Sequence, residues 1–248
     1  MKIIGYSERG AMNALFYGMA FDKEHGEESM KSFIKDLAKI EGNFTGFELY
    51  NEFSLSDFGD PDLMIKAKNE KGDYVVFFIE AKAGCCKYYN LHEQEMHHVD
   101  YMKGGNKYDK GHASNLYFQL RLKNYFFMLL QDFFCDSLER KQEGLTLYND
   151  PKLRLKQKSR ERNRKIGKNV VVEKIVNELK NCKQAYYIAI IPKQNPNIAL
   201  NTEGEYGFKT YTITWEEIHS KFKKYVGETI EFNQNKDKRK SQILNEPI

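Results

Sequence analysis

The stretch that decides the fold is YVVFFIEAKAG, from Tyr74 to Gly84. Its five consecutive apolar residues, 75–79, are typical of a strand buried on both faces of a sheet. Glu80 and Lys82 follow at once, and because side chains alternate between the two faces of a strand, both project from the same side. The sequence therefore predicts a carboxylate and an ammonium group side by side at the end of a buried strand.

A second strand is predicted directly before this one. PDLMIKAK (61–68) and DYVVFFIEAK (73–82) meet at the turn-rich stretch NEKGD, a pattern typical of a β-hairpin. In an antiparallel pair the start of the first strand lies beside the end of the second, so Asp62 is expected to approach Glu80. Two carboxylates at the end of an apolar sheet repel each other and lose hydration, and a bound Mg²⁺ would remove both penalties. Lys82 would then orient or deprotonate an attacking water, or stabilise charge that develops on a phosphate.

The rest of the chain predicts a mixed α/β domain. Helical spacing of apolar residues predicts helices over 7–21, 26–40, 114–134, 170–179 and 215–226, and strand-like stretches cover 46–56, 184–192 and 208–215. This order favours a mixed central β-sheet flanked by helices. We predict one domain over residues 1–231 with insertions at 84–114 and 150–169, followed by a polar, frayed C-terminal tail over 232–248.

Length and composition narrow the class of protein. The chain has 248 residues, enough for a sizeable core, and a modest net charge of +4. Its four cysteines lack CxxC spacing and no signal peptide precedes them, which fits free thiols in the cytoplasm. No apolar run reaches the roughly 18 residues that a membrane span needs, so no membrane partner is expected.

Positive charge is concentrated in one segment. From Lys152 to Lys168 there are nine Lys or Arg residues and the single acid Glu161. Such a cluster indicates a polyanionic partner such as nucleic acid, and a solvated charged loop is the alternative interpretation. The residues expected to contact phosphate are Lys156, Lys158, Arg160, Arg162, Arg164 and Lys165.

Two short stretches of the predicted hairpin resemble the motif of the PD-(D/E)xK nuclease superfamily: Pro61-Asp62 and Glu80-Ala81-Lys82. The resemblance implies a restriction-endonuclease-like core in which Asp62 and Glu80 bind Mg²⁺, with Mn²⁺ able to substitute, and Lys82 assists the nucleophile. It implies a nuclease that hydrolyses phosphodiester bonds, with DNA as the expected substrate and RNA left open, and it suggests restriction or anti-phage defence. Cutting both strands of a duplex would require two active sites and hence a homodimer.

Two further site residues follow from the same resemblance. Members of the family often add an acid from the first helix. Glu8, which lies on the stripe of Met12, Leu15 and Met19, is the better candidate, and Glu27, which extends a stripe on the next predicted helix, is the alternative. An acid in a first turn is also explained by the helix dipole alone. Gln119 lies on an apolar helix face and matches the glutamine that the family often places after ExK, although a structural amide is the alternative. Lys123 stands where one subgroup carries a tyrosine.

Two other classes of function remain in competition with a nuclease. The first is a non-catalytic nucleic-acid-binding module with the same fold. The second is a protein-interaction subunit whose basic segment contacts an acidic partner. The intact set of Asp62, Glu80 and Lys82 favours the nuclease, because a decayed site usually loses one of these residues.

Overall fold

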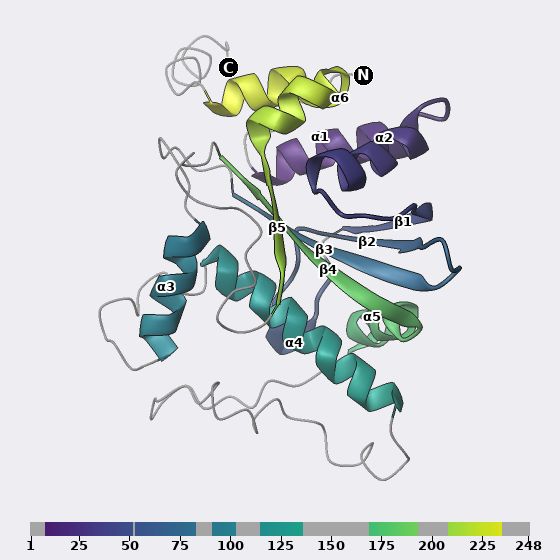
Figure 1. The fold of residues 1–248 in the computed structure, drawn as a ribbon, viewed down its shortest axis with the longest axis vertical. Helices are drawn as coiled ribbons and strands as arrows, with labels where there is room; N and C mark the ends of the chain where they lie inside the picture. Colours follow the sequence, from purple (N-terminus) through teal and green to yellow (C-terminus); the bar gives the residue numbers. More distant parts are fainter. Residues whose placement is uncertain are drawn as a thin grey trace, which may run out of the picture.

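A five-stranded mixed sheet forms the centre of the computed structural model (Figure 1). The structure describes residues 8–51, 53–82, 91–102, 115–135, 169–192 and 208–234. The strands follow one another across the sheet in chain order: β1 (Thr45–Asn51), β2 (Leu63–Lys68), β3 (Tyr74–Ala81), β4 (Cys182–Ile191) and β5 (Thr210–Thr214). The first three strands pair antiparallel, whereas β3, β4 and β5 pair parallel. The predicted mixed α/β class is confirmed.

Helices cover both faces of this sheet (Figure 1). One face carries α1 (Glu8–Phe21), α2 (Gly26–Ser32) with its π-helical continuation η1 (Phe33–Leu37), and α6 (Trp215–Gln234). The opposite face carries α4 (Leu116–Cys135), α5 (Val170–Leu179) and the short 3₁₀ turn η2 (Ser56–Phe58). The remaining helix, α3 (Leu91–Met102), packs against α4. Among the described residues, no helix combines the length and the apolar character needed to cross a membrane.

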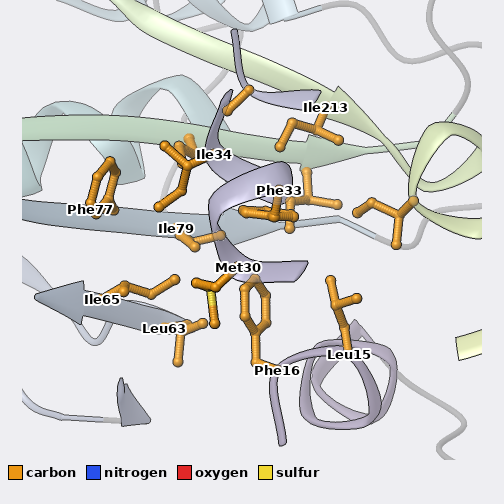
Figure 2. Close-up of a cluster of buried hydrophobic side chains, with 14 of the residues drawn as sticks. Leu15, Phe16, Met30, Phe33, Ile34, Leu63, Ile65, Phe77, Ile79 and Ile213 are labelled. Atoms are coloured by element: carbon orange, nitrogen blue, oxygen red, sulfur yellow. The ribbon is translucent and has the colours of Figure 1, made fainter. Parts of the chain in front are cut away.

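The apolar run of β3 is continuous because each face of the strand contributes to a different core. Phe77 and Ile79 belong to the core on the side of α1 and α2, where Figure 2 shows Ile79 closer than Phe77 to Phe33. Phe78 points the other way and packs on Phe126 of α4, with ring centroids 6.4 Å apart. Burying a side chain of this size contributes about 1.5–3 kcal/mol, so the strand anchors both layers.

The predicted hairpin is confirmed, and its turn has a local cause. Leu63 pairs with Ile79 and Lys68 pairs with Tyr74, so the two strands stay in register to the turn. Asn69 closes the turn, because its side-chain oxygen accepts the backbone N–H groups of Lys71 and Asp73 at 3.0 and 2.9 Å. An asparagine that bonds its own following backbone is a standard turn former.

The structure refines the predicted boundaries. The predicted insertion at 84–114 contains helix α3. Helix α6 runs past Glu231 to Gln234, three residues into the predicted tail, with a kink at Phe222. Residues 235–248 and the basic segment from Lys152 to Lys168 lie outside the described residues.

Candidate active site

Strand register brings Asp62 and Glu80 together. Leu63 is opposite Ile79, so the next step of the antiparallel ladder places Asp62 opposite Glu80. Their neighbours Met64 and Phe78 both belong to the α4 side of the sheet, and the two-residue period puts the two carboxylates on that side as well. Asp62 Oδ2 accepts the backbone N–H of Ala81 at 2.8 Å, which holds the Asp62 carboxylate against the end of β3.

Glu80 is the buried acid of the pair. Only 1% of its surface is exposed, and burial raises its pKa from 4.5 to about 7. Lys123 opposes that rise, the neighbouring charge of Asp62 adds to it, and Lys82 opposes it more weakly. A carboxyl group whose pKa lies near neutrality at a polar strand end is typical of a functional site, although buried structural pairs produce the same shift.

The cation that neutralises Glu80 comes from helix α4. Lys123 Nζ lies 2.6 Å from Glu80 Oε1, and both side chains are 2% exposed. Within the described part of the chain, this ammonium group is the only partner of Glu80 Oε1. Two charges buried this completely require each other, because removing one leaves the other desolvated and unpaired.

Lys82 is held by its backbone at the same strand end. Its N–H donates to the carbonyl of Ile190 in β4, and its carbonyl accepts the indole N–H of Trp215, each at 2.8 Å. Trp215 is the first residue of α6 and is 4% exposed. The indole therefore ties the end of β3 to the start of α6 and leaves the half-buried Lys82 side chain beside Glu80.

Gln119 lies one helical turn before Lys123 on α4. Residues spaced i and i+4 share a helix face, so the side chains of Gln119 and Lys123 leave α4 on the same side. The Gln119 Oε1 atom is buried and accepts no hydrogen bond from any residue that the structure describes. The predicted apolar stripe around Gln119 is confirmed at Leu122, Phe126 and Leu129, which are all buried.

The first-helix acids have different positions. Glu8 is the first residue of α1, and its side chain lies outside the described part of the structure. Glu27 is exposed on α2 and pairs with Lys31 of the same helix at 3.4 Å, so its position is explained as a surface ion pair. Helix α1 nevertheless reaches the edge of the site. Asn51, which pairs with Leu63, donates to Asn13 and Tyr17 of α1.

Sequence reasoning missed Lys123 as a site residue, although a signal was present. Lys123 and Arg121 are the only charged residues between Leu116 and Gln131 of a helix that is otherwise largely apolar. A charge on such a helix must find a buried partner or reach the surface. Both side chains are buried, and Lys123 pairs with Glu80.

Gly59 makes room for Lys123. A Cβ atom added at Gly59 would lie 3.3 Å from Lys123 Nζ. The backbone of Gly59, with φ 75° and ψ 174°, lies in a region that is essentially restricted to glycine. The connection between η2 and β2 therefore passes directly over the ammonium group.

Replacing Gly59 with alanine is expected to lower the free energy of unfolding by about 1–3 kcal/mol, because this backbone conformation is restricted to glycine and an added Cβ would also crowd Lys123 Nζ. Urea denaturation followed by circular dichroism measures this change. Gly46→Ala is the matched control, since Gly46 also has a positive φ of 63° but nothing within 4 Å of an added Cβ. Equal losses in the two variants would show that crowding over Lys123 contributes nothing.

The donor set suits one hard divalent cation. Asp62 and Glu80 each use one carboxylate oxygen, toward Ala81 N–H and Lys123 respectively, and the described residues donate no hydrogen bond to the second oxygens. Mg²⁺ accepts one or two protein carboxylates with water and phosphate oxygens as its other ligands. No cluster of three or more His, Cys, Asp or Glu side chains suited to a metal exists within the described ranges.

The fold and these residues define a mixed α/β protein with a buried, paired carboxylate site at one end of its central sheet. No protein-family model matches the chain, and neither the curated proteins nor the solved structures include a significant match.

Proposed function

We propose that this protein is a metal-dependent nuclease of the PD-(D/E)xK type, with a restriction-endonuclease-like core, that hydrolyses phosphodiester bonds in DNA. The observation that carries the proposal is the hairpin register, which sets Asp62 opposite Glu80, with Lys82 two residues further on and close enough to Glu80 to favour its ionised form. A mixed sheet with helices on both faces supports the same core. The buried free thiol of Cys182 suits a cytoplasmic protein.

Asp62 and Glu80 would hold the Mg²⁺ ion through their second oxygens. When bound, the cation supplies positive charge for the phosphate oxygens and lowers the pKa of water. Asp62 is prepared for this role because Ala81 N–H fixes one of its oxygens. Glu80 must be ionised to act as a ligand, and Lys82 and Lys123 both favour its ionised form.

Lys82 would act on the reacting groups themselves. Hydrogen bonds to Ile190 and Trp215 fix the backbone of Lys82, so the position from which its side chain extends is fixed as well. From there the ammonium group can orient the attacking water or stabilise charge on the phosphate. A preorganised charge of this kind typically raises the reaction rate by about 10²- to 10³-fold.

A non-catalytic nucleic-acid-binding module is the second candidate, and one observation favours it. Lys123 already neutralises Glu80, so the buried acid has a counter-ion without any metal. In that case the basic segment from Lys152 to Lys168 would bind phosphates while the strand end served only to hold α4 in place.

One assay separates the two candidates. The pure protein is incubated with supercoiled plasmid, linear duplex, single-stranded DNA and RNA, each with Mg²⁺ or with EDTA. We expect cleavage of DNA that requires Mg²⁺ and stops with EDTA, and Mn²⁺ should replace Mg²⁺. Binding of the same nucleic acids without any cleavage would contradict the nuclease and support the binding module. A dimer in solution would fit cutting of both strands.

A further inference from the structure

The ammonium group of Lys123 pairs with Glu80, a carboxylate that would also have to bind the proposed metal ion. Lys123 Nζ lies 2.6 Å from Glu80 Oε1, and both groups are shielded from water. A divalent cation at Asp62 and Glu80 would repel this ammonium group at close range. A buried ammonium group that loses its carboxylate needs another acceptor, because leaving it unpaired is costly.

Gln119 offers such an acceptor. Its Oε1 atom is buried and has no hydrogen bond to the described part of the chain, whereas most buried polar side-chain atoms have at least one partner. An amide oxygen accepts from an ammonium group, and the i, i+4 spacing on α4 puts Gln119 within reach of Lys123. Within the described residues, Glu80 is therefore paired with one ammonium group, and an acceptor without a hydrogen bond lies one helical turn away on α4.

We propose that Lys123 moves between two acceptors, Glu80 in the metal-free protein and Gln119 when a divalent cation occupies Asp62 and Glu80. This inference rests on the proposed function. Gln119 and Lys123 are then positioning residues: they adjust the charge on Glu80 and touch neither the nucleic acid nor the reacting atoms. The exchange keeps Glu80 neutralised in both states, by Lys123 in one and by the metal in the other.

Gln119→Leu isolates this exchange. The change removes an acceptor that is idle without metal, so the melting temperature in EDTA should stay the same or rise. Mg²⁺ binding to the full chain without nucleic acid, measured by isothermal titration calorimetry, should weaken by about tenfold to a hundredfold, since a hydrogen bond to a charged group is lost only in the metal-bound state. Mn²⁺, titrated separately, should show the same loss.

Gln131→Leu is the matched control on the same helix. Its amide N–H donates to the carbonyl of Cys182 at 2.9 Å, so the substitution should lower the melting temperature and leave the Mg²⁺ affinity unchanged. In the unmodified protein, Mg²⁺ should also shift the ¹⁵Nζ resonance of Lys123, which reports on its acceptor. Asp62→Asn should abolish that shift.

The possible results distinguish failure of the two-acceptor exchange from failure of the proposed metal site. If the unmodified protein binds Mg²⁺ and Asp62→Asn does not, but Gln119→Leu binds like the parent, then the two-acceptor exchange is wrong and the metal site stands. If the unmodified protein binds no divalent cation, or Asp62→Asn binds equally well, the proposed metal site fails and the exchange fails with it.

Discussion

Asp62→Asn is expected to abolish DNA cleavage, lowering the rate by at least about a thousandfold, because a metal ligand supplies several kcal/mol of transition-state stabilisation. The substitution keeps the shape of the side chain and an oxygen that can still accept the Ala81 N–H, so the hairpin end should be preserved. Cleavage of plasmid with saturating Mg²⁺ measures the rate, and circular dichroism checks the fold.

Asp60→Asn provides a control with the same change in charge. Asp60 lies two residues earlier and is exposed, before β2 begins. Its loss should leave the cleavage rate within a few-fold of the parent. Equal activity in Asp62→Asn and the parent would remove Asp62 from the catalytic site, and equal losses in both variants would mean that general charge near the hairpin, not a metal ligand, is being measured.

The second large effect is expected from the buried pair of Lys123 and Glu80. Two single substitutions test this pair in metal-free protein at pH 8: Lys123→Met and Glu80→Met. Each should lower the free energy of unfolding by about 3–5 kcal/mol, because it leaves one buried charge without its partner. The double variant should recover most of that loss, because two apolar side chains of similar size replace the pair. Denaturation in urea with EDTA gives the four values of this double-mutant cycle.

The pH dependence of stability provides an independent check on Glu80. Its pKa is about 7 in the folded protein and 4.5 when unperturbed, so between these values the folded state retains a proton that the unfolded chain has lost. Stability from this group is therefore greatest below pH 4.5, falls as pH rises through the window to pH 7, and is lower by about 3 kcal/mol above it. The double variant should lack this fall. A coupling energy near zero, with the same pH profile in all four proteins, would show that the pair is not a unit.

The hairpin could be predicted from sequence because its information is local. Alternating faces, a short turn at 69–73 and an uninterrupted apolar run are all contained within 61–82. The same locality explains why Asp62, Glu80 and Lys82 could be identified together, since a hairpin with a fixed register has only one way to align its ends.

Features that could not be predicted from the sequence depend on contacts between distant segments of the chain. Helix α3 is mostly polar, and it is held by packing on α4, where its Glu95 is 6% exposed. The exposure of Glu27 also followed from tertiary structure, because an apolar stripe on a short helix does not say which residues at its edge reach solvent.

The amino-acid sequence by itself determined the mixed α/β class, the hairpin and the pair of carboxylates at its open end, because each depends on side-chain period and short-range turn chemistry. Only the tertiary structure decided that Glu80 is neutralised by Lys123 and that the Gln119 Oε1 atom has no hydrogen bond within the described residues. Strand β3 and helix α4 are separated by a long connection, and the rotation of α4 on the sheet is set by the packing of whole faces. That packing determines which charge meets Glu80, and no local pattern encodes it.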